Sequence, residues 1–182
     1  MSDTDAGLGK VVVNRAMSLD GFIAGPGDTM DWIVDYGKEY SFPEVMAATG
    51  AMLVGRRTHE VAKGMAAEDT DYDGGPQFVL THRPPDEPEP GVTFLTCDLA
   101  EAVATARAAA GGKNLEILGA DLASQCLRRG LVDEVLVYVL PVLLGDGVRY
   151  STSDLGRIDL EPFGNSQSGP VTMLRFRVRK HA

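Results

Sequence analysis

Three segments of the sequence combine residue types that can hold a phosphate, and each directly follows an expected strand. Gly55–Thr58 places two guanidiniums and a hydroxyl at a helix start, where free N–H groups and the helix dipole favour an anion. Thr81–Arg83 offers a hydroxyl, an imidazole and a guanidinium that could grip a ribose 2′-phosphate. In Leu118–Asp121 a strand passes through glycine into a helix, so the backbone can approach a pyrophosphate closely.

Each of these segments also has a purely structural explanation. The two arginines after Gly55 could be a solvated helix start, Thr81–Arg83 a polar turn before Pro84, and Gly119 an ordinary strand-to-helix turn. The sequence contains no Gly-x-Gly-x-x-Gly, so the Rossmann fingerprint is absent. A dinucleotide, if bound, is therefore held in another way.

A fourth segment, Ala16–Gly25, carries a single carboxylate, Asp20, among apolar neighbours. Such surroundings can raise the pKa of a carboxylate or let it hold the N–H groups of a substrate. An Asp-Gly pair is also an ordinary turn. Asp31 and Trp32 add a second carboxylate and the only tryptophan, which could wall a planar heterocycle or fill the core.

The elements that must position these segments alternate between strand and helix. Short apolar runs rich in β-branched residues predict buried strands, and the pairs Ser41/Glu44 and Asp98/Glu101 match capping boxes at helix starts. The expected strands are Lys10–Met17, Ala51–Val54, Gln77–Thr81, Val92–Leu95, Leu115–Leu118 and Val132–Leu140, followed by an antiparallel hairpin of Ile158–Pro162 and Val171–Val178. The expected helices are Ser41–Thr49, a short one after Arg57, one from Asp98 to about Gly111, and Asp121–Arg129.

This alternation predicts an α/β fold of three layers, with a mostly parallel central sheet, helices on both faces and a C-terminal antiparallel hairpin. A chain of 182 residues suits one domain. We expect a flexible tail over residues 1–9 and a single domain over residues 10–180. In such sheets ligands bind outside the carboxyl ends of the strands, which is where the three phosphate-type segments lie.

Composition and charge exclude several classes of protein. Twenty-six acidic residues against seventeen basic ones give a net charge of -9, which opposes binding to nucleic acid or to an anionic membrane. The longest apolar run, Val132–Leu144, is interrupted by acidic residues and a proline and is too short for a membrane span. The N-terminus lacks the features of a secretory signal, so we expect a cytoplasmic protein. Two cysteines and three histidines predict neither a disulfide framework nor a metal site.

Several motifs occur together along the chain: Ser18–Ala24, Asp31-Trp32, Leu53–Glu60, Gly119-Ala120, Gly130–Glu134 and Pro141–Gly147. In these motifs and their order, over Lys10–Val178, the sequence resembles the dihydrofolate reductase-like superfamily. More closely, it resembles the stand-alone relatives of the C-terminal reductase domain of riboflavin biosynthesis. Several linked motifs are far more specific than any one of them.

The resemblance implies that NADPH binds across the three strand ends and delivers a hydride to a pyrimidine- or pteridine-like ring of a small-molecule substrate. Asp20 would face that substrate as the catalytic residue, with Ser18 and Trp32 beside it. The implied cofactor-binding residues are Ala16, Ile23, Gly55, Arg56, Arg57, Thr58, Thr81, His82, Arg83, Gly119, Ala120, Asp121 and Leu122. A homodimer is also implied, and Val132–Leu140 with the loop after it would offer its surface.

Departures from the family pattern keep other functions open. Relatives often carry consecutive glycines where this chain has Gly119-Ala120, and the extra methyl narrows the gap for a phosphate. The His-x-Glu and Cys-x-x-Cys of a zinc deaminase domain are absent. Glu44 is expected to cap its helix, which argues against folate as substrate. The alternatives are a reductase of another small molecule, dihydrofolate included, and a non-catalytic NADPH-binding protein of the same fold.

Overall fold

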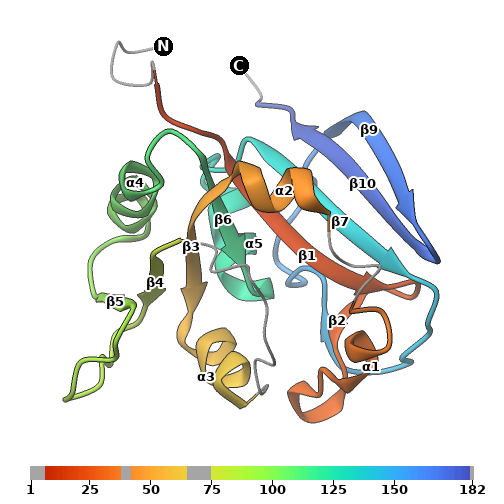
Figure 1. Ribbon diagram of the computed structural model, residues 1–182, viewed down its shortest axis with the longest axis horizontal. Coiled ribbons are helices and arrows are strands. Elements are labelled where there is room, and N and C mark those ends of the chain that lie inside the picture. Colours follow the sequence, from red (N-terminus) through yellow and green to blue (C-terminus); the bar gives the residue numbers. More distant parts are fainter. Residues whose placement is uncertain (1–6, 38–41, 65–74, 181–182) are drawn as a thin grey trace.

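The valine-rich strand β1 (Val11–Ser18) lies inside an eight-stranded sheet in this computed structural model, which describes residues 7–37, 42–64 and 75–180. The order across the sheet is β5-β4-β3-β6-β1-β7-β10-β9 (Figure 1). The other strands are β3 (Thr49–Gly55), β4 (Gln77–Leu80), β5 (Val92–Leu95), β6 (Asn114–Leu118), β7 (Glu134–Leu140), β9 (Leu160–Ser168) and β10 (Val171–Val178). All pairs from β5 to β7 are parallel, and β10 pairs antiparallel with both β7 and β9.

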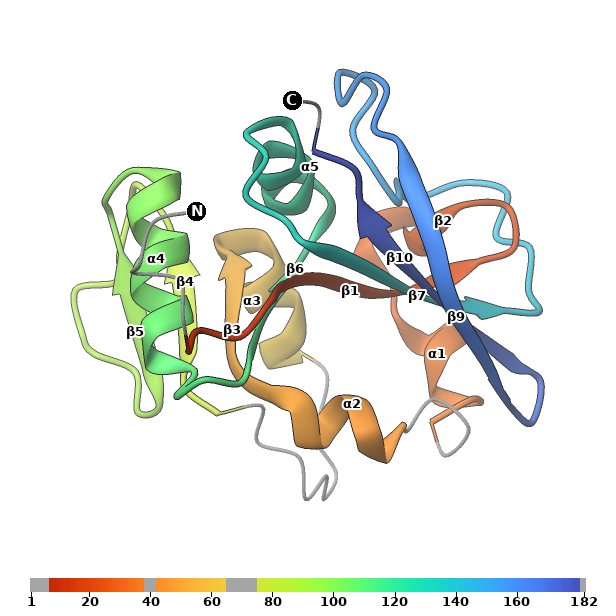
Figure 2. The ribbon, with the colours of Figure 1, turned by 90° about the horizontal axis from the view of Figure 1, so that it is seen from above.

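Helices cover the sheet on both faces, and residues of β1 alternate between the two cores. Val11 and Val13 pack in the core beneath α4 (Leu99–Ala109) and α5 (Ala120–Arg128). Val12 and Ala16 belong to the core on the opposite face, together with residues of α1 (Asp31–Val34) and α2 (Pro43–Ala48). The layers are seen in Figure 2, where α4 and α5 lie on the opposite side of β1 and β3 from α2.

The strand order has one switch, and it determines where the loops meet. From β1 the chain moves outward through β3, α3 (Arg56–Gly64), β4 and β5, and then returns to insert β6 between β3 and β1. Because these strands are parallel, the carboxyl ends of β1, β3, β4 and β6 lie at one edge of the sheet. A crevice at such a switch is the usual ligand site of an open α/β sheet.

The predicted α/β architecture is confirmed: a mostly parallel sheet, helices on both faces and a C-terminal antiparallel hairpin. The predicted start of α2 is wrong. Phe42 is the N-cap residue, with no side-chain cap, and Ser41 lies outside the described residues. Pro43 occupies the first turn, where its fixed φ favours the helix and its missing N–H needs no cap. Asp98 does cap α4, since its carboxylate accepts a hydrogen bond from the Ala100 N–H.

Several short elements escape sequence analysis because they are too brief to show a period. They are β2 (Phe22–Ala24), a 3-10 turn (Pro26–Asp28), α1 and β8 (Val148–Arg149). Strands β2 and β8 pair as a separate two-stranded antiparallel sheet. Strand β9 is longer than predicted, and a register shift between Arg175 and Phe176 accommodates Pro162 and Gly164 opposite them.

Strand β7, predicted to form part of a self-association surface, pairs with β1 on one side and β10 on the other, and the homodimer stays a prediction. Its residues are mostly buried in the two cores, so the strand has no free edge or face. The following loop does leave Leu143 well exposed. Among the helices of the described residues, none combines the length and apolar character that crossing a bilayer requires.

Candidate functional site

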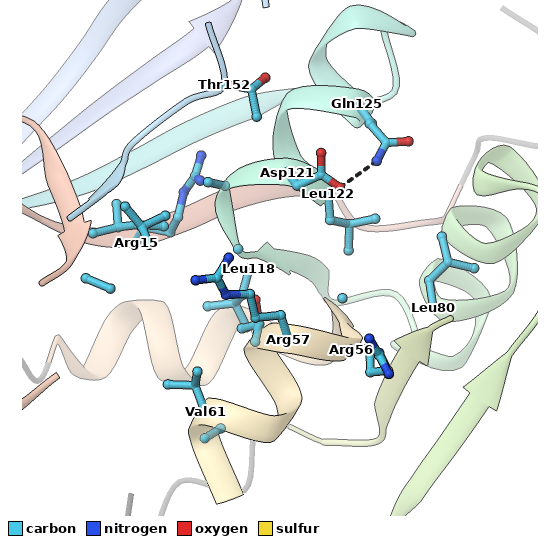
Figure 3. Close-up of a pocket in the computed structure, with 18 of the residues that line it drawn as sticks. Arg15, Arg56, Arg57, Val61, Leu80, Leu118, Asp121, Leu122, Gln125 and Thr152 are labelled. Atoms are coloured by element: carbon cyan, nitrogen blue, oxygen red, sulfur yellow. Dashed lines mark hydrogen bonds between the residues drawn. The ribbon is translucent and has the colours of Figure 1, made fainter. Parts of the chain in front are cut away.

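A cavity of about 740 Å³ lies at the carboxyl ends of the parallel strands, on the switch in strand order (Figure 3). Its lining comes from segments that are far apart in the sequence: the end of β1, the starts of α3 and α5, and the turn after β4. Cavities of this size suit cofactors and drug-sized ligands. The lining is largely apolar, with Ile23, Met30, Ile33 and Val61 among its residues.

Gly119 and Thr58 bring the starts of α5 and α3 together in this cavity. Gly119 has a φ of 92°, which side-chain-bearing residues rarely adopt, and it is the N-cap residue of α5. A Cβ at this position would lie 2.4 Å from the Thr58 Oγ1. Glycine is therefore required here both for the backbone conformation and for the close approach of the two helix starts. The two helix starts, whose first N–H groups have no partner within their own helices, therefore lie close together.

Three arginines at the edges of the cavity are each paired with a carboxylate. Arg57 donates two hydrogen bonds to Asp28, at 2.8 and 2.7 Å, and so links α3 to the loop after β2. The other two pairs, each within 4 Å, are Arg129 with Asp98 and Arg56 with Glu60. All three arginines are exposed, so these ion pairs are screened and weak and can be exchanged for an anionic ligand.

Arg15 is a functional candidate that sequence analysis missed. It lines the cavity from β1, yet its side chain is buried, with only 4% of the residue exposed. Its guanidinium lies over the Tyr150 ring, 4.1 Å from the centroid, and burial lowers the pKa of Arg15. The available signal was an arginine inside the expected strand, two residues after a run of three valines, where a neutral residue is expected.

The structure places nearly all sequence-predicted cofactor residues in this one cavity. The predicted residues found in its lining are Ala16, Ile23, Gly55, Arg56, Arg57, Thr58, Thr81, His82, Gly119, Ala120, Asp121 and Leu122. Arg83 is the exception, since it is exposed and absent from the lining, while its backbone N–H donates to the Thr81 hydroxyl. The turn after β4 therefore presents Thr81 and His82 inward and Arg83 outward.

The three residues predicted to contact substrate do not line the cavity. Ser18 is fully buried, and its hydroxyl donates to the Asp20 carboxylate at 2.6 Å and accepts from the Phe22 N–H. Trp32 packs against the core that contains Val12, while Met30 and Ile33 on either side of it line the cavity. Sequence analysis chose the tryptophan of α1, whereas its aliphatic neighbours face the site.

Asp20 joins two distant loops instead of facing the cavity. Its carboxylate accepts hydrogen bonds from the backbone N–H groups of Leu144 and Gly145, at 3.1 and 2.7 Å. These bonds and that of the Ser18 hydroxyl, which contributes most, lower the pKa of Asp20 to about 2. The group is therefore a carboxylate near neutral pH, and the geometry favours positioning over proton donation.

The three carboxylates that do line the cavity also have partners. Asp28 binds Arg57, Asp98 caps α4 and pairs with Arg129, and Asp121 accepts a hydrogen bond from the Gln125 side chain at 2.8 Å. Over residues 7–37, 42–64 and 75–180, no three His, Cys, Asp or Glu side chains cluster in a way that could hold a metal ion.

Comparisons with known proteins agree with this geometry. A family model described as the RibD C-terminal domain matches residues 9–173. The chain is similar to protein YwjB of Bacillus subtilis (strain 168), with 26% identity over 170 residues that cover 92% of this chain and 97% of that one. A Shewanella sp. PV-4 structure named for riboflavin biosynthesis has a TM-score of 0.79 and 23% identity, covering 94% of this chain and 99% of its own.

A further solved structure is a larger protein of two named activities. The diaminohydroxyphosphoribosylaminopyrimidine deaminase/5-amino-6-(5-phosphoribosylamino)uracil reductase of Thermotoga maritima has a TM-score of 0.67 and 18% identity. The similarity covers 96% of this chain but only 58% of that protein. At these identities the structural likenesses establish a shared fold.

Proposed function

Because the chain belongs to the RibD C-terminal domain family, we propose that it is an NADPH-dependent reductase of a small pyrimidine- or pteridine-like ring. One observation carries the proposal: strand ends separated along the sequence, each with phosphate-binding chemistry, line a single cavity. The similar Thermotoga maritima protein is named for a uracil-derivative reductase activity, which supports this substrate class.

The chemistry of the cavity lining supports NADPH as the ligand. The close approach of Gly119 to Thr58 leaves a backbone cradle that a Cβ would fill, and such cradles suit a pyrophosphate. Arg56 and His82 stand at the outer side, where they could hold phosphates of the adenosine half. Ala16 and Ile23 offer a small and an aliphatic side chain for a flat nicotinamide. When bound there, the cofactor would supply the hydride.

We assign Asp20 the role of a positioning residue for this reaction. It ties the turn that precedes β2 to the loop at Leu144 and Gly145, and β2 carries Ile23 into the cavity. A loss of this carboxylate should displace Ile23 without removing any group that contacts phosphates. We expect Asp20→Asn to reduce turnover more than NADPH affinity; an equal loss of both would contradict the assignment.

A titration with NADPH and NADH side by side tests the cofactor proposal. Wild-type protein should bind NADPH in preference to NADH, and His82→Ala should weaken NADPH binding by about tenfold, the worth of one charge-assisted hydrogen bond, while leaving NADH unchanged. Arg83→Ala is the matched control, because Arg83 is next in sequence but outside the lining. No saturable NADPH binding to wild type would refute the proposal, and a loss confined to Arg83→Ala would move the 2′-phosphate site.

One observation favours a second candidate, a protein that binds NADPH without turnover. Each carboxylate in the described lining already has a partner, so no free acid stands ready to donate a proton. A screen of candidate rings and carbonyl compounds, read by NADPH oxidation, separates the two. Binding without oxidation of NADPH by any of them would favour the second candidate.

A further inference from the structure

The side chain of Arg15 carries a buried charge that the protein leaves without a hydrogen-bonding partner. None of its three guanidinium nitrogens, Nε and the two Nη atoms, has a partner among the described residues. A guanidinium has five N–H donors, and a buried charge without partners is strongly unfavourable. Such a buried guanidinium is tolerated when a bound ligand supplies the missing hydrogen-bond acceptors.

Arg15 differs in this respect from every other arginine of the described lining. Arg56, Arg57 and Arg129 each lie within 4 Å of a carboxylate, and all three are exposed. Arg15 is the innermost of the four by burial and the only one of them with no acidic partner in the described structure. The protein therefore provides a counter-charge for each outer cation but not for the inner one.

The place of Arg15 in the sheet puts its charge near the start of α5. Val13 on β1 lies opposite Ile117 on β6, and two residues further along these parallel strands come Arg15 and Gly119. Arg15 also lies on the same face of β1 as Val11 and Val13, which pack against α5. Figure 3 draws its nitrogen atoms directed away from β1, toward the side of the cavity where α5 and Thr152 lie.

The contacts of Tyr150 orient the guanidinium without satisfying it. The ring covers one face of the guanidinium at 4.1 Å, which holds the plane in place by a cation–π interaction. The N–H groups lie in that plane and stay available at its edge. The Tyr150 hydroxyl is likewise buried. It lies close enough to Arg15 to favour the charged guanidinium and so to oppose the lowering of the Arg15 pKa by burial, but the contact does not have the geometry of a hydrogen bond. Both groups therefore keep N–H or O–H donors that a bound anion could use.

From this geometry we propose that Arg15 is a ligand-binding residue, which with the start of α5 forms an inner anion subsite for a phosphate or carboxylate group of the bound ligand. The observations on Arg15 require only that the ligand carries an anionic group. The identity of that ligand rests on the proposed function. Two sources share this chemistry: a phosphate of the cofactor, or an anionic group of the substrate. A ligand without a negative charge at this position would therefore bind weakly in the inner cavity.

The test compares wild type with Arg15→Met, which removes the charge and keeps much of the side-chain length. The first arm titrates NADPH into each protein. The second titrates inorganic phosphate and ribose 5-phosphate into each protein saturated with NADPH. Arg177→Met is the matched control, since Arg177 also stacks on an aromatic ring, 4.6 Å from the Phe163 centroid, but lies outside the cavity. Arg15→Lys keeps the charge and serves if the Met variant does not fold.

A cofactor phosphate in the subsite predicts that Arg15→Met weakens NADPH binding by about tenfold to a hundredfold. A substrate anion predicts unchanged NADPH binding, with phosphate or ribose 5-phosphate binding to wild type and lost in Arg15→Met. Either result supports the proposal, and Arg15→Lys should lose less in the same arm. Equal binding by wild type and Arg15→Met in both arms overturns it.

Thermal unfolding separates this role from a structural one. Without ligand, Arg15→Met should melt at or above the wild-type temperature, because an unpartnered buried charge is gone. The rise in melting temperature that the ligand causes should be smaller in the variant. A variant that melts lower than wild type with an unchanged ligand-induced rise identifies Arg15 as structural and overturns the proposal. If wild type binds no NADPH, the proposed function fails, and pyrophosphate binding to the protein alone then decides the subsite.

Discussion

The contact between Gly119 and Thr58 yields the sharpest prediction. In Gly119→Ala, a side chain is forced into a backbone conformation with φ 92° and ψ 142°, a region close to glycine-only space, which costs about 1 to 3 kcal/mol. The new Cβ would also lie 2.4 Å from the Thr58 Oγ1, and overpacking of this kind costs about 1 to 3 kcal/mol more. We therefore expect Gly119→Ala to lower the free energy of unfolding by about 2 to 6 kcal/mol.

Two further variants separate the backbone cost from the steric cost. Gly130→Ala is a control, because Gly130 has a φ of 66° and a Cβ there would meet nothing within 4 Å. It should cost about 1 to 2 kcal/mol, the left-handed penalty alone. Thr58→Ala removes the Oγ1 and leaves the Thr58 Cβ at an ordinary 3.5 Å, so Gly119→Ala in that background should recover the steric part.

Urea unfolding of wild type, the three single variants and the double variant measures these differences in the free energy of unfolding. An NADPH titration of each protein shows whether the cradle at the start of α5 binds the cofactor. Thermal melting should follow, at about 2 to 4 °C for each kcal/mol. NADPH binding should weaken in Gly119→Ala and be unchanged in Gly130→Ala. Equal costs for the two glycine variants, with no coupling between Gly119→Ala and Thr58→Ala, would refute the close approach and the cradle drawn from it.

Three other predictions rest on individual side chains. Burial raises the pKa of Glu116, so the protonated carboxyl stabilises the fold fully below the ordinary pKa of 4.5, and this stabilisation is lost as the pH rises through the raised value. Glu116→Gln should therefore melt higher than wild type near neutral pH. A lower melting temperature of the variant at every pH would contradict this. The Ser18 hydroxyl and two backbone N–H groups lower the pKa of Asp20 to about 2, so the stabilisation by this carboxylate is present above pH 3.8 and is lost as the pH falls toward 2. The melting temperature of Asp20→Asn should therefore decline less in this acid range than that of wild type. Identical pH profiles would count against these hydrogen bonds. Burial raises the pKa of Cys126 to about 12, so a thiol reagent should leave Cys126 unmodified in the native protein. The same reagent should modify Cys97, which lines the cavity, and NADPH should slow that reaction. Peptide mapping identifies the labelled cysteine, and fast labelling of Cys126 would argue against the core packing.

Local sequence patterns predicted most elements and the three phosphate-type segments of the cavity lining. The valine run of β1, the cap at Asp98 and the glycine before α5 each act within a few residues, so their structural meaning can be read directly from the chain. The three phosphate-type segments were found for the same reason. Each is a short motif at a strand end, and parallel strands bring their carboxyl ends to one edge whatever the details of packing.

Contacts between distant segments decided what the sequence left open. Asp20 looked like a catalytic carboxylate until its partners, 124 and 125 positions away at Leu144 and Gly145, became known. Arg15 had no predicted role, and only the packed structure shows that the segment at Tyr150 covers it. Short-range propensity and periodicity determine where strands and helices form, because they depend on neighbours in the chain. Which charges are buried, and which remain without a partner, depends on neighbours in space, and only the packed structure brings those together.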